Sequence, residues 1–424
     1  MLIFISAGEP SGDLHGANLV RSMRKVLPDA EFVGFGGPRM ARAGVTLHFQ
    51  LTNLAIMWFL QVFQNIFTFL RLLKEAEQFF REKKPDALVL IDYPGFHWLL
   101  AKRAKKHGIK VFYYVPPQIW AWAGWRIKKV KKYVDKVFCS LPFEPQWYAE
   151  RGYSHAEYIG HPFFDELAER QLETDFLADQ QSHVGQVILL LPGSRTLELD
   201  RNLPAMLRAA ASVAAELSDV RFVVACHRDR HAEQARSIAQ TCFEASQKNP
   251  GAKPSIDPAR LSVYSGKTPE MMRLADVAWA VSGSVSLELL HETLPTVVLY
   301  TVRPIDLLIA RPFIKSKYIC LVNLLAHAEV MPEYLTDRDV SAELAGWALK
   351  WLKASATRGE ASRRLRDLRD RVAQPGASDR AATAIAEALG TRVQPSIYRG
   401  PHVAPGLRRR GRRTDEWPGD WARS

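Results

Sequence analysis

Short apolar runs alternate with longer stretches of helical periodicity along most of the chain. In the first half the runs that fit strands are 2–6, 31–35, 87–91, 111–115 and 136–140, and the helical stretches lie near 14–26, 60–83, 96–107 and 124–133. Strands that alternate with helices are typical of a parallel sheet covered by helices on both faces. The pattern therefore predicts a doubly wound α/β domain over residues 1–165.

The same pattern starts again in the second half. Here the expected strands are 187–191, 220–225, 261–264, 277–281 and 296–300, and the expected helices are 203–217, 229–246, 269–274 and 285–292. We therefore expect a second Rossmann-like domain over 180–341, joined to the first by a polar linker and facing it across a cleft. Residues 342–390 are charged and helical and could pack back on the first domain.

The most apolar part of the chain, 54–73, has two different faces when it is drawn as a helix. Gln61, Gln64, Asn65 and Thr68 fall on one face, and Ile56, Leu60, Phe63, Phe67 and Leu70 fall on another. A membrane-spanning helix needs about 20 predominantly apolar residues, and polar side chains interrupt this stretch. We therefore expect an amphipathic helix, which either faces the core of the first domain or dips into a bilayer and receives acyl chains.

Composition and charge narrow the class of protein. The 424 residues contain 57 Lys and Arg against 45 Asp and Glu, and the net charge of +12 favours anionic partners. Residues 391–424 hold eight arginines and three acids among Pro and Gly, which predicts a disordered basic tail. The four cysteines are widely spaced, and no signal-peptide pattern follows Met1. We therefore expect a cytoplasmic protein with reduced thiols.

One loop of the second half combines the groups that hold a phosphate. The apolar run 187–191 opens directly into Pro192, Gly193, Ser194 and Arg195. Glycine lets backbone N–H groups approach an anion, serine adds a hydroxyl, and arginine offers a planar fork of donors. This strand and turn therefore predict a phosphate-binding site.

A second loop of the same half strengthens that prediction. Ser282, Gly283 and Ser284 follow the run 277–281 and begin a helix, whose free N–H groups and positive dipole end attract an anion. Glu288, one turn further on, could accept hydrogen bonds from two ribose hydroxyls. Each loop alone could equally be a helix cap with a solvated acid. Together, in one half and each after a strand, they favour a nucleotide diphosphate.

Carboxylates follow two strands of the first half. Asp92 ends the strand 87–91, where open α/β sheets bind ligands, and it could act as a general base on a substrate hydroxyl. Glu9 and Asp13 take the corresponding place after strand 2–6, and Asp13 is best explained as the cap of the helix that follows. His97 could be a second base, but a histidine among aromatic neighbours is more often a packed ring.

Two further segments of the first half leave alternatives open. Trp120 and Trp122 come after a double proline and form a rigid aromatic wall, which lines a sugar or acyl pocket or packs in the core. The basic run 126–136 is either a solvated helix face or a surface that holds anionic head groups.

An ordered set of segments gives the chain a specific resemblance. The segments are Ser6-Ala7-Gly8-Glu9, Ser11-Gly12-Asp13, Gly36-Gly37-Pro38-Arg39-Met40, Ile91-Asp92, Trp120-Ala121-Trp122, Gly160-His161-Pro162, Leu191-Pro192-Gly193-Ser194-Arg195, Ser282-Gly283, Leu287-Glu288 and Asn323-Leu324-Leu325. In this order the chain resembles the lipid-A-disaccharide synthase family of glycosyltransferases from residue 6 to about 335. Gly95, His97 and Ser286 depart from the family pattern, and the arginine-rich tail lies outside it.

The resemblance implies a GT-B fold and a hexosyl transfer. The family joins UDP-2,3-diacylglucosamine to 2,3-diacylglucosamine 1-phosphate, forms the β-1,6-linked disaccharide of lipid A and releases UDP. Its members need no cofactor and no catalytic metal. Both substrates are acylated, so the resemblance implies a cytoplasmic enzyme at the inner leaflet of the cytoplasmic membrane, with no nucleic acid as a partner.

The resemblance also assigns residues to roles by matching position. It implies Asp92 as the general base, Arg195 as a contact to the UDP phosphates and Asn323 as another residue of the cleft. Glu9, from its position after strand 2–6, is a second catalytic candidate. The expected donor site consists of Gly193, Ser194, Arg195, Ser282, Gly283, Ser284, Glu288 and Asn323, in which Glu288 is placed on the ribose by analogy with other UDP-sugar enzymes. The expected acceptor and lipid site consists of Ser11, Gly12, Trp120, Trp122, Phe63 and Phe67.

Two other functions remain open at this point. One is a different UDP-sugar enzyme of GT-B fold, either a lipid-linked N-acetylglucosaminyltransferase or a UDP-N-acetylglucosamine epimerase. The other is a nucleotide-regulated binding protein that places its arginine tail on nucleic acid.

Overall fold

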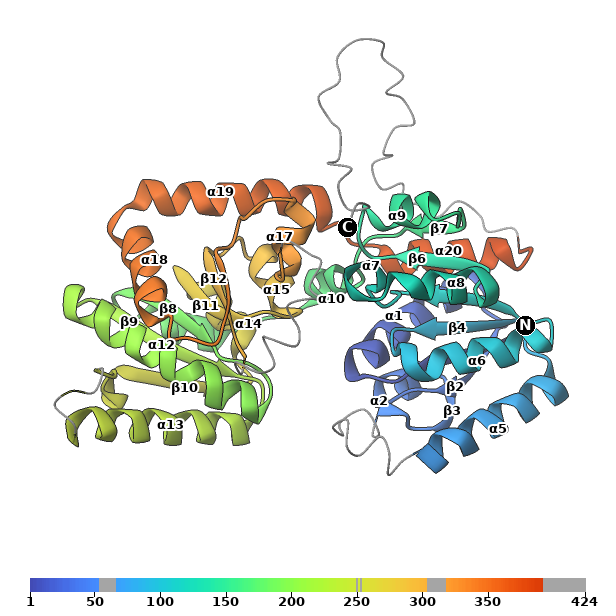
Figure 1. Cartoon of the computed structure of the whole chain (residues 1–424), viewed down its shortest axis with the longest axis horizontal. Coiled ribbons are helices and arrows are strands. Elements are labelled where there is room, and N and C mark those ends of the chain that lie inside the picture. Colours follow the sequence, from blue (N-terminus) through green and yellow to red (C-terminus); the bar gives the residue numbers. More distant parts are fainter. Residues whose placement is uncertain (53–65, 249–250, 252–253, 303–317, 392–424) are drawn as a thin grey trace, which may run out of the picture.

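The computed structural model describes residues 1–52, 66–248, 251, 254–302 and 318–391, which form two α/β domains (Figure 1). The first domain has a seven-stranded sheet in the order β3-β2-β1-β4-β5-β6-β7, and the second has a six-stranded sheet in the order β10-β9-β8-β11-β12-β13. Neighbouring strands of the described chain pair in parallel throughout. The two doubly wound sheets confirm the predicted fold class.

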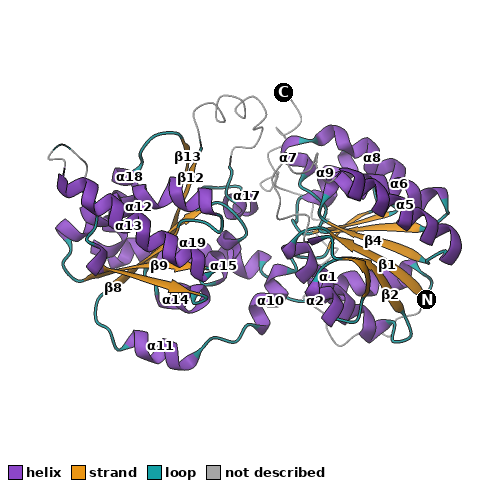
Figure 2. Cartoon of the chain, turned by 90° about the horizontal axis from the view of Figure 1, so that it is seen from below, coloured by secondary structure: helices purple, strands orange, loops and turns teal. Residues whose placement is uncertain are grey.

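The first domain and the connection that follows it comprise these elements: β1 (Leu2–Ala7), α1 (Pro10–Val26), β2 (Glu31–Phe35), α2 (Pro38–Arg42), β3 (Thr46–Phe49), α5 (Ile66–Lys83), β4 (Ala87–Ile91), α6 (Pro94–Lys106), β5 (Lys110–Tyr114), α7 (Ile119–Trp122), α8 (Ile127–Tyr133), β6 (Lys136–Cys139), α9 (Glu144–Glu150), β7 (Ala156–Tyr158), α10 (Phe163–Glu169) and α11 (Thr174–Gln181). The expected linker therefore contains two short helices; Figure 2 shows α10 between the domains and α11 alongside the second domain.

The second domain and the C-terminal helices comprise β8 (Gln186–Leu191), α12 (Thr196–Glu216), β9 (Val220–Cys226), α13 (Asp229–Lys248), β10 (Leu261–Ser265), α14 (Thr268–Leu274), β11 (Val277–Val281), α15 (Val285–His291), β12 (Thr296–Thr301), α17 (Leu321–Ala326), β13 (Glu333–Thr336), α18 (Ser341–Lys353), α19 (Ser355–Val372) and α20 (Ala377–Ala388). Each predicted strand has a counterpart here, and α12 begins directly after Arg195, earlier than its apolar periodicity indicates.

Three short strands were not predicted, and all three lie at or near sheet edges. β3, β7 and β13 have four, three and four residues, and only one of their side chains is fully buried. Strands of this kind carry no apolar run because solvent reaches them. The central strands are different: all five residues of β4 and of β11 are buried, which explains why their sequences read as continuous apolar runs.

The sheet of the first domain separates two hydrophobic cores. Ile3, Ile5 and Ala7 of β1 pack with residues of α1 and α20 on one face. Phe4 of the same strand packs with residues of α5 and α6 on the other face. This division follows from the alternation of side chains along a strand.

The C-terminal helices divide between the domains. α18 packs on α12 and α19 packs on α15, so both stay with the second domain, whereas α20 packs along α1 of the first domain. The carboxylate of Asp165 in α10 holds the start of α20, because it accepts hydrogen bonds from the backbone N–H groups of Gly376 (2.6 Å), Ala377 (3.1 Å) and Ser378 (2.9 Å). Of the helices in 342–390, only α20 returns to the first domain.

A shared hydrophobic cluster joins the two domains near these crossings. Leu141, Phe164 and Leu167 are buried in the same cluster as strands β8 and β11 of the second domain. The ring of Phe143 also meets the ring of His327 at a centroid distance of 5.7 Å. The domains therefore contact each other through packed side chains as well as through the chain itself.

Candidate active site

Each sheet has one point where the direction of chain winding reverses, and some of the predicted site residues lie there. In the first sheet this switch point lies between β1 and β4, and in the second it lies between β8 and β11. Ligands of open α/β sheets bind outside the carboxyl ends of the strands at such points. Glu9 follows β1 and Asp92 follows β4, while Arg195 follows β8 and Ser282 follows β11.

The main chain around Asp92 is strained and firmly held. Asp92 and Tyr93 both adopt left-handed conformations, with φ of 51° and 49°, which costs about 1–3 kcal/mol per residue. Two side chains stabilise this bend, because the hydroxyl of Tyr113 donates to the carbonyl oxygen of Asp92 at 2.8 Å and Nδ1 of His97 reaches the same oxygen at 2.6 Å. The carboxyl group of Asp92 is thereby presented beyond the end of β4.

His97 supports this bend and is not placed as a second base. Burial lowers the pKa of its imidazole to about 3, so the ring is neutral at physiological pH. Because Nδ1 donates to the carbonyl of Asp92, Nε2 accepts, and the hydroxyl of Ser6 lies 2.9 Å from it. Both ring nitrogens are engaged, and the ring is fully buried among aromatic residues.

The carboxyl group of Asp92 has the proton affinity of a base that works near neutral pH. Its pKa is raised to about 6, first by burial and then by the negative charge of Glu9, while a hydrogen bond from the Tyr93 backbone opposes the rise. A general base works best when its pKa lies near the working pH. Asp92 is therefore ionised at pH 7 and still basic enough to accept a proton from a hydroxyl group.

The loop after β1 lies directly against the loop after β4. A side-chain carbon built on Gly8 would lie 2.2 Å from the ring of Tyr93, and one built on Gly12 would lie 3.6 Å from the carbonyl oxygen of Ile91. Glu9 and Ser11 are exposed at the start of α1. The structure thus brings the loop that contains Glu9 close to Asp92, and the charge of Glu9 acts on the Asp92 carboxyl group.

Asp13 has a different role from the predicted one. We expected it to cap its own helix, but Glu9 holds the N-cap position of α1. The buried carboxylate of Asp13 instead accepts hydrogen bonds from the backbone N–H groups of Gly37 (2.9 Å), Arg39 (3.0 Å) and Met40 (2.9 Å). It therefore fixes the start of α2 against α1, a contact between segments that are distant in the sequence.

The turn after β8 is exposed, and an acid of its own helix occupies it. Gly193 has a φ of 127°, which favours glycine. Oε2 of Glu198 accepts from the backbone N–H groups of Ser194 (2.8 Å) and Arg195 (3.3 Å), and Oε1 accepts from the Arg195 guanidinium at 3.0 Å. A carboxylate thus takes the donors that we assigned to a phosphate. Sequence reasoning missed Glu198, although an acid in the first turn of a helix signals such a contact.

A buried asparagine supports the same turn. The amide of Asn202 donates to the carbonyl oxygens of Glu198 (2.8 Å) and Pro192 (3.3 Å), and its oxygen accepts from the backbone N–H of Thr301 at 3.1 Å. It therefore ties the turn after β8 to the end of β12. Sequence reasoning missed this residue too, because its partners lie on a distant strand.

The loop after β11 is open on the side of Gly283. Among the described residues, nothing lies within 4 Å of a side-chain carbon built there, and Ser284 is exposed. The hydroxyl of Ser282 donates to the carbonyl of Ile319 at 3.2 Å, and that of Ser286 donates to the carbonyl of Gly283 at 2.8 Å. The backbone of this loop is therefore braced by its own serines, and the part nearest the switch point remains free.

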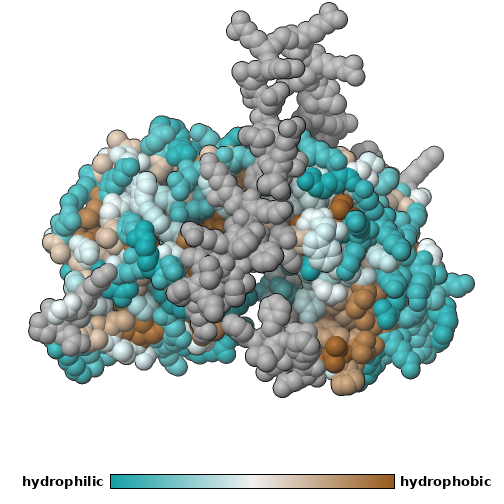
Figure 3. All heavy atoms as spheres, in the orientation of Figure 1, coloured by the Kyte–Doolittle hydropathy of each residue, from teal (hydrophilic) through white to brown (hydrophobic). Residues whose placement is uncertain are grey.

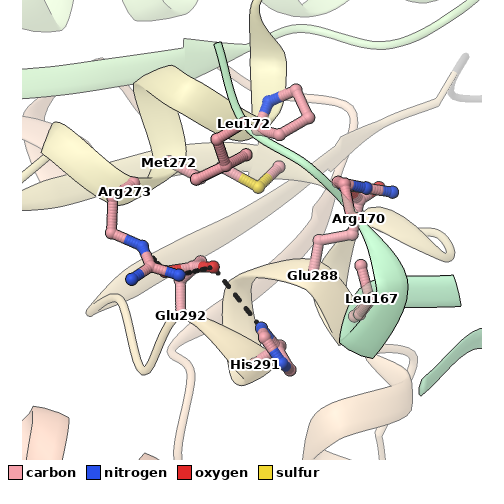
Figure 4. Close-up of a pocket in the computed structure, with 9 residues that line it drawn as sticks. Leu167, Arg170, Leu172, Met272, Arg273, Glu288, His291 and Glu292 are labelled. Carbon is pink, nitrogen blue, oxygen red and sulfur yellow. Dashed lines mark hydrogen bonds and ion pairs between the residues drawn. The ribbon is translucent and has the colours of Figure 1, made fainter. Parts of the chain in front are cut away.

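Glu288 is paired with an arginine of the linker. Its carboxylate accepts a 2.5 Å hydrogen bond from Arg170, and the two side chains line one pocket beside α14 and α15 (Figure 4). Burial raises the pKa of Glu288, while Arg170 opposes that rise. A ribose that reached the Glu288 carboxylate would also contact Arg170. The predicted ribose contact would therefore include this arginine of the linker.

Asn323 is fully buried and saturated with hydrogen bonds. Its amide nitrogen donates to Met331 O (2.6 Å) and Glu333 Oε2 (3.1 Å), and its oxygen accepts from Val330 N and Met331 N, both at 2.9 Å. A direct contact to the donor, as expected from the sequence, would require some of these bonds to break. In this structure the side chain holds the segment before β13.

The expected lipid and acceptor residues are dispersed. Phe67 is 79% exposed at the start of α5, where Ile66 and Leu70 are exposed as well. Figure 3 shows a hydrophobic area at the lower right, on the side of the molecule where Figure 1 places α5. Trp120 is partly buried, its ring meets that of Phe143 at 4.9 Å, and Nε1 donates to Glu144 at 3.1 Å. Phe63 and the side chain of Trp122 lie outside the described residues.

Neither a membrane span nor a metal cluster occurs in the part of the chain that the structure describes. Within these residues no helix combines the length and apolar character needed to cross a bilayer. The same residues hold no group of three or more His, Cys, Asp or Glu side chains arranged to bind a metal ion.

Two doubly wound domains of this kind place the chain in the GT-B class of folds. Solved structures share this architecture: the S. aureus MnaA–UDP co-structure has a TM-score of 0.62 at 12% identity and covers 92% of this chain and 97% of that chain. UDP-GlcNAc 2-epimerase from Neisseria meningitidis, bound to UDP-GlcNAc, has a TM-score of 0.59 at 11% identity and covers 92% and 99%. At such low identity the likeness shows the fold alone.

The sequence comparisons identify the family. A family model described as lipid-A-disaccharide synthetase matches residues 3–387. Lipid-A-disaccharide synthase of Myxococcus xanthus (strain DK1622) is 35% identical over 388 residues, 91% of this chain and 97% of that protein. Its counterpart from Syntrophus aciditrophicus (strain SB) is 36% identical over 386 residues, 90% of this chain and 96% of that protein. The chain belongs to the lipid-A-disaccharide synthase family of glycosyltransferases.

Proposed function

We propose that the protein transfers a 2,3-diacylglucosamine unit from UDP to the 6-hydroxyl of 2,3-diacylglucosamine 1-phosphate. The product is the β-1,6-linked lipid A disaccharide 1-phosphate, and UDP is released. The observation that carries this proposal is Asp92, a strained and clamped acid with a pKa of about 6 at the switch point of the first domain. Family membership supplies the identity of the substrates.

We infer that the reaction is a single displacement with inversion. The Asp92 carboxylate takes the proton of the acceptor 6-hydroxyl, and that oxygen attacks the anomeric carbon of the donor from the face opposite UDP. The bond between the anomeric carbon and the phosphate oxygen breaks, and its electron pair leaves with UDP. Arg195 and the backbone N–H groups of Ser194 and Arg195 stabilise the charge of the diphosphate.

Glu198 must exchange places with the diphosphate in this scheme. Its carboxylate now accepts hydrogen bonds from the same N–H groups and the same guanidinium. Because two anions cannot share these donors without strong repulsion, we infer that the Glu198 side chain turns away when the donor binds. No cofactor takes part in the proposed reaction.

We also propose that the protein is cytoplasmic and binds peripherally to the inner leaflet of the cytoplasmic membrane. Ile66, Phe67 and Leu70 expose 45%, 79% and 53% of their surfaces at one end of α5. Sedimentation of the protein with vesicles of anionic phospholipid tests this proposal. Phe67→Ser should reduce sedimentation with the vesicles, whereas Val184→Ser, at a site that is 82% exposed in the second domain, should not. Equal losses in both variants would contradict the proposed membrane face.

An assay with both lipid substrates tests the proposed reaction. Purified protein is mixed with UDP-2,3-diacylglucosamine and 2,3-diacylglucosamine 1-phosphate, and UDP release is measured together with the disaccharide by mass spectrometry. We expect both products in equal amounts and expect the rate at which they form to fall by about 10²- to 10⁴-fold with Asp92→Asn. UDP-N-acetylglucosamine is supplied in a parallel reaction. Its conversion to an epimer, without disaccharide in the first reaction, would replace the proposal with an epimerase.

A further inference from the structure

The proposed acceptor carries a phosphate, and none of the residues assigned to the general base or to the donor site binds it. This inference therefore rests on the proposed function and extends it to the acceptor. A cation for that phosphate must lie in the first domain, near Asp92 but not beside it, because the phosphate and the reacting 6-hydroxyl lie on different carbons of the sugar. Arg39 of α2 meets these conditions.

The backbone of Arg39 is held rigidly. Its N–H group donates to the buried carboxylate of Asp13, which also binds the N–H groups of Gly37 and Met40. The Met40 side chain is fully buried, and its sulfur would lie 2.7 Å from a side-chain carbon built on Gly16 of α1. These contacts lock the first turn of α2 onto α1, so the point from which the Arg39 side chain extends is fixed.

The guanidinium of Arg39 is free within the described residues. The residue is exposed, and no hydrogen bond or ion pair joins its side chain to any described residue. Arg24, which also lies against this segment, is engaged with the carbonyl oxygens of Ala43 and Gly44. Arg39 thus combines a fixed backbone with an unneutralised charge.

The positive charge of Arg39 acts on the first turns of α1. Burial and then Arg39 lower the pKa of His15 to about 4, so its ring is neutral at physiological pH. His15 is 7% exposed, and its Nδ1 atom has no hydrogen-bond partner. The positive charge of Arg39 therefore reaches α1, the helix that begins after β1 at the same edge of the sheet as Asp92.

The spacing between Arg39 and Asp92 fits one sugar phosphate. Arg39 comes just after β2 and Asp92 just after β4, and β1 lies between these strands. Two strand spacings correspond to ~10 Å along the sheet edge. A glucosamine that offers its 6-hydroxyl to Asp92 carries the C1 phosphate about one ring width away, within reach of an arginine side chain.

We propose that Arg39 binds the phosphate of the acceptor and so selects a phosphorylated acceptor over the same lipid without phosphate. The planar guanidinium makes two parallel hydrogen bonds to phosphate oxygens. Arg39 is then a specificity residue, separate from the chemistry at Asp92 and from the donor site at Arg195.

The test compares Arg39→Gln, Arg39→Lys and the wild type on two acceptors, with and without the 1-phosphate. The acceptor without phosphate is measured as a substrate or, where turnover is not detected, as a competitive inhibitor. Arg42→Gln, on the same short helix and equally exposed, is the matched control. Thermal melting and UDP binding verify that each variant is folded.

We expect Arg39→Gln to raise the KM for the phosphorylated acceptor by about 10- to 100-fold, as for a lost hydrogen-bonded charge. The KM for the donor and the constant for the acceptor without phosphate should stay unchanged, and Arg39→Lys should restore part of the loss. An equal loss on both acceptors, or an Arg42→Gln effect of the same size, would overturn the inference.

Failure of the proposed function gives a different result. The wild type would then form no disaccharide from either acceptor. Direct binding of the phosphorylated lipid to the wild type and to Arg39→Gln, measured by calorimetry, still decides the role of Arg39 in that case. Binding that is the same in both proteins rejects it, and binding that the variant loses supports it.

Discussion

Asp92 and Arg195 lie at the switch points of the two sheets, but their surroundings are opposite. Asp92 is half-buried, its main chain is strained, and Tyr113 and His97 hold its carbonyl oxygen. The Arg195 side chain is 74% exposed, and Glu198 of the same helix neutralises it. The switch point at Asp92 is therefore preorganised before substrate binds. The switch point at Arg195 must exchange the Glu198 carboxylate for the diphosphate of the ligand.

The difference matches what each half of the proposed reaction requires. A base needs a fixed position and partial removal from water, because both raise its affinity for the proton of a hydroxyl group. A site for a charged nucleotide must bind and release it in every turnover, so exposed donors that carry a replaceable carboxylate suit it. We therefore expect changes at Asp92 to alter the rate and changes at Arg195 or Glu198 to alter UDP affinity.

The largest effect should come from Asp92→Asn. The substitution keeps the shape and the carbonyl contacts of the residue but removes its proton affinity, so kcat should fall by about 10²- to 10⁴-fold. UDP affinity, measured by calorimetry, should stay close to that of the wild type. Near-normal turnover would remove Asp92 from the role of base.

The next largest effect should come from Arg195→Ala. Loss of the guanidinium removes hydrogen bonds to a charged ligand, so UDP should bind about 10- to 100-fold more weakly. Because the side chain is exposed, the melting temperature should change little. Arg195→Lys keeps the charge but not the planar fork of donors, so its UDP affinity should lie between those of the wild type and Arg195→Ala. An unchanged UDP affinity would place the diphosphate elsewhere.

Glu198→Gln should have a smaller effect of the opposite sign. The amide keeps one oxygen for the backbone N–H groups but no longer competes as an anion for Arg195. Exposed ion pairs contribute at most about 1 kcal/mol, so UDP should bind about two- to fivefold more tightly. Calorimetry at low salt measures this change. Weaker binding would show that Glu198 shapes the turn and does not compete with the ligand.

The smallest effect should be a shift in pH dependence. Asp92 must be ionised to accept a proton, so kcat/KM should rise with pH through about 6. Glu9→Gln removes a like charge, which lowers the pKa of Asp92 and moves this rise to lower pH. Glu31→Gln, at the opposite end of the sheet in β2, is the control and should leave the profile unchanged. A shift to higher pH in Glu9→Gln would contradict the assigned electrostatics.

Much of the candidate site could be predicted from the sequence. Asp92, Arg195 and Ser282 each follow an apolar run, and strands buried on both faces are the clearest signal in an α/β sequence. The position after a strand then indicates the ligand-binding edge of the sheet. The edge strands β3, β7 and β13 escaped prediction because they are short and partly solvated.

The roles of several polar residues could not be predicted in this way. Asp13 binds backbone groups of α2, Asn323 binds the segment before β13, and Glu288 binds Arg170 of the linker. In each case the partner lies on another element. A sequence shows that a residue can accept or donate hydrogen bonds, but it does not show which groups will stand opposite it.

The order of apolar and polar residues by itself determined two doubly wound domains and the loops that carry the chemistry, because burial of strands is encoded locally along the chain. The clamp of Tyr113 and His97 on Asp92 and the return of α20 to the first domain became visible only in the folded molecule. These features depend on contacts between distant segments, whose free energy exists only once both domains have packed.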